Sequence, residues 1–210
     1  MRIMRDKRGT SIYFDLAGFL FITCKFKPSI VIHPEKDGTV LYISGNLRMK
    51  VDPEHGARIT SLTLNDREIL YQGNLGLDNF GSTFLPSPQS FWVWPPPAII
   101  NTRPYKVVKT GDSFKYISQK DTVTGLIAAK EIMPDKYGNF IDVNYCFINK
   151  NDTVFAVASW QNTRLMKGGL FFFETGEKTY TRKLFNPLPL EYINGYTWYN
   201  DTTQLPLDHH

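Results

Sequence analysis

From position 39 onward, hydrophobic and polar residues alternate with a period of two, the spacing that turns one face of a β-strand toward a core. Turn residues such as Asp52-Pro53 and Asn65-Asp66 separate the alternating segments. No window longer than a turn or two shows the period of a helix. The predicted strands cover residues 40–43, 47–51, 57–64, 67–71, 105–109, 113–119, 125–133, 139–149, 153–160 and 170–173. We therefore expect an all-β fold, an antiparallel β-sandwich in which two packed sheets bury these strands.

Residues 139–149 carry apolar side chains on both faces of the predicted strand. Ile141, Val143 and Phe147 occupy alternate positions, while Cys146 and Ile148 share the opposite face. This pattern predicts that both faces are covered for much of the strand. We expect Cys146 to be a buried free thiol, and a disulfide with Cys24 stays open as an alternative.

Residues 73–104 interrupt the strand pattern. Their glycines and prolines, including the run Pro95-Pro96-Pro97, predict that the segment forms no regular ladder, because proline lacks the backbone donor. The same segment is rich in aromatic residues, among them Phe91, Trp92 and Trp94. A long loop of this composition is expected to pack over the sheet or to line a binding site.

The net charge of +4 is confined to one end of the chain of 210 residues. Residues 1–27 hold six basic and two acidic side chains, and the remaining basic and acidic residues cancel. A nucleic-acid partner is not expected, because its phosphates require a concentrated basic face. The histidines and cysteines lack the spacing of a zinc site, so we expect neither a metal nor another cofactor.

Residues 1–38 are predicted to precede the sandwich domain, which covers residues 39–210. Basic residues, the apolar run 16–22 and then Cys24 follow the order of a lipoprotein signal, in which Cys24 would carry the lipid. The alternative is an upstream extension of the domain. A signal would make the protein extracytoplasmic, periplasmic or secreted, with Cys24 as its only membrane anchor, whereas an extension would fit a cytoplasmic protein. The apolar run is too short to span a bilayer as a helix.

Two groups of motifs resemble the galactose-mutarotase-like (aldose-epimerase-like) superfamily. Pro53-Glu54-His55-Gly56-Ala57-Arg58-Ile59 followed by Glu68-Ile69-Leu70 is similar to the opening of these domains. Pro86-Ser87-Pro88-Gln89 and Trp92-Val93-Trp94-Pro95-Pro96-Pro97 resemble an uncharacterised bacterial branch of the superfamily. The resemblance covers residues 40–176 and implies a supersandwich with a sugar-sized groove. After residue 176 it stops, so the chain is either truncated relative to the family or divergent there.

The resemblance does not extend to the family's chemistry. Catalytic members use a histidine acid and a glutamate base across the sugar, but no histidine occurs between Gly56 and Leu207. His55 falls in a turn, and Glu174 is an isolated glutamate in a predicted strand. Catalytic residues are therefore unknown, and a complete mutarotase mechanism is not expected.

Five residues are candidates for saccharide binding. The indoles of Trp92, Trp94 and Trp160 could stack on sugar rings, with core packing as the alternative. Gln89 could hydrogen-bond a hydroxyl group or cap its own loop. Arg58 could reach a ligand from the groove floor or form an ion pair with Glu68 or Glu131.

Three functions follow from these observations. The first is a carbohydrate-associated β-sandwich that binds a saccharide without classical mutarotase catalysis. The second is an enzyme, an aldose epimerase or another carbohydrate-active enzyme of the isomerase type, whose acid and base are not assigned. The third is a non-functional fragment of a longer parent.

Overall fold

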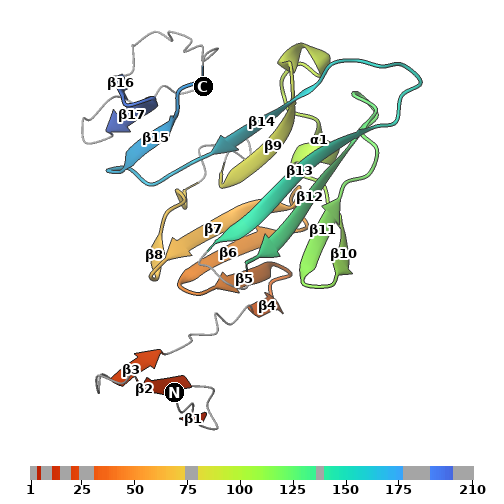
Figure 1. Ribbon diagram of the computed structural model, residues 1–210. Helices are drawn as coiled ribbons and strands as arrows, with labels where there is room; N and C mark the ends of the chain where they lie inside the picture. Colours follow the sequence, from red (N-terminus) through yellow and green to blue (C-terminus); the bar gives the residue numbers. More distant parts are fainter. Residues whose placement is uncertain are drawn as a thin grey trace.

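The computed structural model is built almost entirely of antiparallel strands, as the alternating pattern predicts (Figure 1). It describes residues 4–5, 11–14, 20–23, 31–73, 80–135, 140–176 and 190–200. Cys24, the predicted lipid anchor, lies outside the described residues. Two larger sheets form the main body, and two three-stranded sheets lie toward the ends of the chain.

The larger of the two main sheets has the strand order β14-β9-β7-β6-β5-β4, with β8 paired to β7. Its strands are β4 (Val31–Pro34), β5 (Val40–Ser44), β6 (Leu47–Asp52), β7 (Arg58–Leu64), β8 (Arg67–Glu68), β9 (Ser82–Ser87) and β14 (Ala158–Thr163). Strand β4 pairs with β5, so the sheet begins before the domain boundary that we predicted at residue 39.

The second main sheet has the order β10-β11-β12-β13. Its strands are β10 (Lys106–Thr110), β11 (Ser113–Ile117), β12 (Leu126–Pro134) and β13 (Ile141–Asn149). The remaining strands are β1 (Met4–Arg5), β2 (Ser11–Phe14), β3 (Leu20–Thr23), β15 (Leu170–Glu174), β16 (Leu190–Ile193) and β17 (Tyr196–Asn200). Two short helical turns, η1 (Gln89–Phe91) and α1 (Ala98–Asn101), follow β9.

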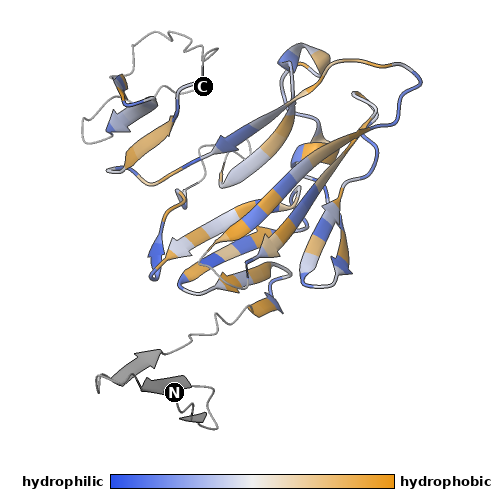
Figure 2. Ribbon diagram, in the orientation of Figure 1, coloured by the Kyte–Doolittle hydropathy of each residue, from blue (hydrophilic) through white to orange (hydrophobic). Residues whose placement is uncertain are grey.

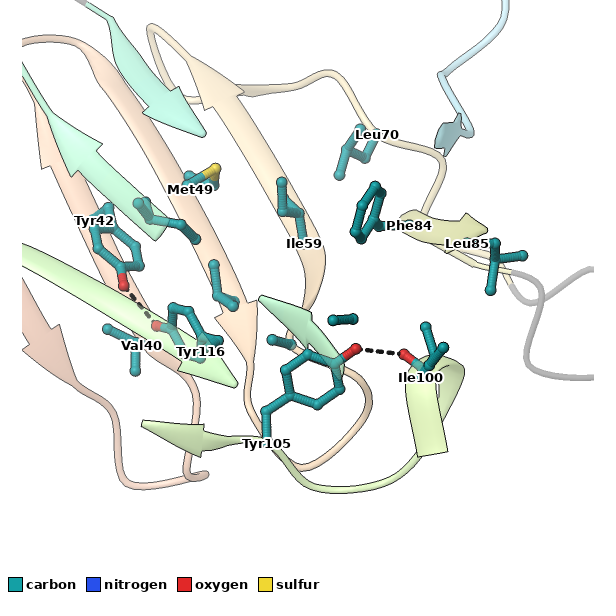
Figure 3. Close-up of a cluster of buried hydrophobic side chains, with 14 of the residues drawn as sticks. Val40, Tyr42, Met49, Ile59, Leu70, Phe84, Leu85, Ile100, Tyr105 and Tyr116 are labelled. Carbon is teal, nitrogen blue, oxygen red and sulfur yellow. Dashed lines mark hydrogen bonds between the residues drawn. The ribbon is translucent and has the colours of Figure 1, made fainter. Parts of the chain in front are cut away.

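The two main sheets pack face to face and enclose the hydrophobic core. The Tyr42 hydroxyl of β5 lies 2.6 Å from the Tyr116 hydroxyl of β11, inside the core (Figure 3). At the other side of the core, the ring of Phe84 on β9 stacks on Phe147 of β13 with centroids 4.2 Å apart. Hydrophobic and hydrophilic residues alternate along the strands of both sheets, as one-sided burial requires (Figure 2).

The prediction that residues 73–104 form no ladder is wrong for β9, which lies between β14 and β7. The Arg164 N–H donates to the Gly81 carbonyl, and this bond shows which residues of β9 face β14. The backbone N–H and C=O groups of odd-numbered β9 residues bond β14, and those of even-numbered residues point away from β14. Pro86 has an even number, so its backbone nitrogen points away from β14, and on the other side β7 pairs with β9 only at Ser82. Pro86 therefore needs no ladder donor, and its carbonyl accepts a hydrogen bond from the Trp92 indole.

The prediction that both faces of residues 139–149 are covered is also wrong. Side chains of β13 alternate between half-buried and exposed, because nothing in the described part of the chain packs on the outer face of this sheet. Cys146 is a free thiol as expected, but it is exposed on that outer face rather than buried.

The Tyr42–Tyr116 pair gives a test of the core. Changing either tyrosine to phenylalanine should lower the free energy of unfolding by about 1–3 kcal/mol, because the remaining hydroxyl is left buried without its partner. The double variant should lose less free energy of unfolding than the two single variants lose together, because neither hydroxyl remains buried without a partner. Urea unfolding of all four proteins measures this coupling. The exposed Tyr192→Phe serves as the control, and additive single effects would contradict the prediction.

Candidate functional site

Arg58, predicted to reach a ligand from a groove floor, is a buried structural residue at the start of β7. Its side chain is 1% exposed, and its guanidinium donates to the Asn101 carbonyl at 3.1 Å and the Asn101 amide oxygen at 3.2 Å. The guanidinium carbon also lies 4.2 Å from the ring centroid of Phe80. Arg58 therefore attaches α1 and the start of β9 to β7, and no ligand can reach it.

The two glutamates proposed as partners of Arg58 are engaged elsewhere. The Glu68 carboxylate accepts bonds from the Ser61 hydroxyl and from the backbone N–H of Leu62, at 2.6 and 3.0 Å. Burial raises the pKa of this carboxyl and these donors lower it, with a lowered pKa as the net result. Glu131 lies 3.7 Å from the Lys115 ammonium.

Trp92 and Trp160 are brought together, as the stacking hypothesis requires, but one of them is buried. Their ring centroids are 6.1 Å apart and their planes are inclined by 32°. Trp92 is 7% exposed and donates from its indole N–H to the Pro86 carbonyl at 2.9 Å. Trp160 is half-buried and donates to the Asn162 side-chain oxygen at 3.0 Å. Trp92 therefore anchors the loop and cannot stack on a ligand.

This pair lies on the outer face of the larger sheet. Phe84 points inward onto β13, so the next residue, Leu85, points to the opposite face. Trp160 is the cross-strand neighbour of Leu85 and shares its face. The segment that holds η1 and α1 therefore covers the face of β9 that points away from the second sheet.

Trp94 is separated from Trp92 by a sharp backbone turn, so the two indoles do not share a face as they would in an extended segment. Val93 between them has a φ of 54°, a left-handed conformation rare for a β-branched residue. Trp94 remains 54% exposed. We name this exposed region the Trp94 surface; it consists of Gln89, Phe91, Val93 and Trp94.

Hydrogen bonds and ring contacts hold the Trp94 surface in place. The Gln89 carbonyl accepts the backbone N–H of both Trp92 and Val93, at 3.1 and 3.0 Å, while the Gln89 side chain is exposed. Phe91 meets Phe155 edge-on with centroids 5.3 Å apart. Of the five predicted residues, Gln89 and Trp94 are thus exposed in the same turn, and Trp160 is half-buried in contact with Trp92.

Lys130 is a buried residue that was not among the predicted site residues. Its ammonium on β12 donates to the carbonyls of Gly56 and Ala57, at 2.7 and 2.8 Å, and lies 5.7 Å from the Tyr105 ring centroid. Burial, with a smaller contribution from the charge of Arg58, lowers the pKa of Lys130 to about 7. The residue ties the second sheet to the turn between β6 and β7.

A second polar group lies between the sheets on the side of β13 and β14. The Ser82 and Thr163 hydroxyls are 2.9 Å apart, and the Tyr145 hydroxyl interacts with Ser82 and Gln161. Burial raises the pKa of Tyr145 above its ordinary value. These polar side chains lie at the margin of the core, where β14 of the larger sheet extends beyond the edge strand β13 of the smaller sheet.

The residues considered for acid–base chemistry lie in different parts of the fold. His55 is exposed in the turn after β6, with its Nδ1 2.7 Å from Asp52, and Glu174 ends β15. Among the residues that the structure describes, no three histidine, cysteine, aspartate or glutamate side chains are close enough to hold a metal ion. None of the described helices is long and apolar enough to cross a membrane.

A small polar hollow lies away from all the predicted residues. Its volume is about 190 Å³, and it is lined by Gly45, Asn46, Arg48, Asn65 and Asp66. The Arg48 guanidinium bonds the Asp66 carboxylate there, so the charges in the hollow satisfy each other.

No protein-family model matches this sequence, and a search of curated proteins finds no match. The comparisons therefore leave the mutarotase-like resemblance as a hypothesis.

The buried ammonium predicts a specific pH dependence. The folded pKa of Lys130, about 7, lies below the unfolded value of about 10.4, so the unfolded chain binds more protons between these values. The free energy of unfolding should rise by about 2 kcal/mol from pH 7 to pH 9 because of this residue. Urea unfolding at both pH values tests this: Lys130→Met should abolish the rise, and the surface control Lys115→Met should retain it. An equal rise in Lys130→Met would contradict the assignment.

The left-handed Val93 predicts a stabilising substitution. Val93→Gly should raise the free energy of unfolding by about 0.5–1.5 kcal/mol, because relief of backbone strain exceeds the entropy that glycine adds to the unfolded chain. Val154→Gly is the control: Val154 is fully exposed and is not among the residues with positive φ. It should destabilise slightly, and thermal unfolding that ranks the two variants the other way would refute the argument.

Proposed function

We propose that this protein is a carbohydrate-associated, mutarotase-like β-sandwich that binds neutral saccharides through the Trp94 surface, without aldose-epimerase chemistry. The packing of two antiparallel sheets supports the sandwich part of the proposal. The supersandwich type and the family membership rest on the motifs between residues 53 and 97.

The single observation that carries the proposal is the exposure of Trp94 on an anchored turn. Exposed apolar side chains that lie together mark binding surfaces, and Trp94 is exposed together with its sequence neighbours Phe91 and Val93. The turn is fixed by the Trp92–Pro86 hydrogen bond, and α1 after it by Arg58. A preorganised ring loses little conformational entropy on binding, so its contact with the apolar face of a sugar contributes more to affinity.

The chemistry of the neighbouring residues favours a neutral ligand. Residues 79–102 contain no aspartate, glutamate, lysine or arginine. The exposed amide of Gln89, in the same turn as Phe91 and Trp94, can both donate to and accept from a sugar hydroxyl. Exposed aromatic rings and an amide, without charge, match the alternating apolar and hydroxyl surfaces of a pyranose.

Removal of the Trp94 ring tests the proposal directly. Titration calorimetry with a panel of neutral mono- and oligosaccharides of glucose, galactose, mannose and xylose should identify a ligand for the wild type. Trp94→Ala should weaken its binding about tenfold, as expected for loss of one aromatic contact, without changing the unfolding temperature.

The matched control is Phe172→Ala, which removes an equally exposed ring from β15, outside the Trp94 surface. It should leave affinity unchanged. Polarimetry should give a mutarotation rate equal to that of buffer. The proposal fails if folded wild type binds no member of the panel, or if Trp94→Ala binds as tightly as Phe172→Ala.

A further inference from the structure

The open edge of the smaller sheet lies beside a step between the two layers. Strand β13 ends this sheet, and among the described residues only β12 pairs with it (Figure 1). The stacking of Phe84 on Phe147 places β13 over β9, and β14 is the next and last described strand of the larger sheet. The larger sheet therefore extends past β13 by one strand. A single strand added beside β13 would lie over β14.

The backbone groups along this edge are available for pairing. The Asp135 N–H donates to the Phe140 carbonyl, so even-numbered residues of β13 bond β12. The odd-numbered residues Val143, Tyr145 and Phe147 consequently direct their N–H and C=O groups to the open edge. Strand β13 is nine residues long, contains no proline and carries one charge, so it lacks the devices that usually prevent an edge strand from pairing.

The step between the layers accommodates one strand and not a second sheet. If β13 of a second copy paired here about a two-fold axis, the β9 of that copy would fall where β14 of this chain lies. The larger sheets of the two copies would overlap, so symmetric pairing of two copies at this edge is excluded. A single extended peptide carries no second layer, and neighbouring strands need only about 4.8 Å between them.

The floor of the step is polar, and its wall is aromatic. Phe84 points inward, and Gln161 is its cross-strand neighbour on β14. Ser159, Gln161 and Thr163 therefore share the inner face of β14, and all three are exposed. The half-buried ring of Tyr145 stands beside them on β13. Threonine at the inward positions of an added strand would place its hydroxyl on this floor and its methyl group against the wall.

The outer face of β13 adds a charge requirement. Asp142, Asn144 and Cys146 are exposed on this face, where they would be cross-strand neighbours of the added strand. No basic side chain among the described residues forms an ion pair with the Asp142 carboxylate. A lysine or arginine opposite Asp142 would supply that partner, because opposite charges at facing positions of a strand pair stabilise the pairing.

We propose that the β13 edge binds an extended segment of another protein, with threonine or serine at alternate positions and a basic residue opposite Asp142. The segment pairs antiparallel to residues 141–147, as all described strand pairs of this sheet do. Main-chain hydrogen bonds supply affinity, and the side chains on the two faces supply specificity. The inference does not depend on saccharide binding at the Trp94 surface.

The first experiment titrates the full chain into a fluorescently labelled peptide, Thr-Val-Thr-Ser-Thr-Lys-Thr, whose lysine would face Asp142. Fluorescence anisotropy should give a dissociation constant below about 1 mM. N-methylation of the third and fifth peptide residues, whose N–H groups would bond β13, should weaken binding about tenfold or more. N-methylation of the second and fourth residues, whose N–H groups would point to solvent, should change affinity by less than about twofold.

A charge swap tests the register on the outer face. Asp142→Lys should weaken binding of this peptide about fivefold, and a peptide with glutamate in place of its lysine should restore the affinity. The matched control is Asp112→Lys, which reverses an exposed charge in the turn between β10 and β11. It should leave the affinity for both peptides unchanged.

Cys146 gives a second check of the register. In the full chain with Cys24→Ser it is the sole cysteine. A peptide with cysteine at its second position would face Cys146 in a non-hydrogen-bonded pair, where Cα atoms are about 4.5 Å apart and a disulfide can form. Diamide should join the two thiols, with two electrons and two protons passing to diamide. A peptide with cysteine at its fifth position, on the inner face, should cross-link far less.

Amide hydrogen exchange shows whether the edge is already occupied. The N–H groups of Val143, Tyr145 and Phe147 should exchange quickly in the free protein, and the peptide should slow them. Slow exchange without peptide would mean that another segment of the chain or a second copy covers the edge, and it would overturn the proposal. So would no binding by folded protein at about 1 mM peptide, equal effects of the two N-methylated peptides, no rescue in the charge swap, or equal cross-linking from both cysteine positions.

Discussion

The two main sheets bury each other's apolar faces. Polar groups between the sheets are therefore removed from water, and each must form hydrogen bonds within the protein to offset the cost of burial. Burial of the Lys130 ammonium is especially costly, because the group can carry a charge that is removed from water. It donates hydrogen bonds to two carbonyls of the β6–β7 turn. A Cβ added to Gly56 in that turn would lie 2.3 Å from the Asn101 carbonyl, so α1 packs directly against it. Lys130 and Arg58 thus hold the turn from the inner and the outer side, and small displacements there would disturb both sheets.

The loop on the outer face depends on that same turn. Arg58 binds Asn101 of α1, and the Tyr105 hydroxyl donates to the Ile100 carbonyl, so the last two residues of α1 are attached to the core (Figure 3). With α1 fixed and Trp92 bonded to Pro86, the five residues between Trp92 and α1 are held at both ends. The exposure of Trp94 is therefore a consequence of core packing rather than of a loose loop, and this is why we assign the binding surface to it.

Most strands follow from the period of two, because half-buried strands must alternate to satisfy a one-sided core. Strand β9 was missed because Pro86 and Pro88 suggest a loop, whereas the ladder places Pro86 where no donor is required. For the candidate site, residue type identified Gln89 and Trp94 as candidates, but it could not separate them from Arg58 and Trp92, which are buried. That distinction depends on the positive φ of Val93 and on contacts with α1, which are tertiary. The hairpin of β16 and β17 did carry a local signal, Asn194-Gly195, both with positive φ.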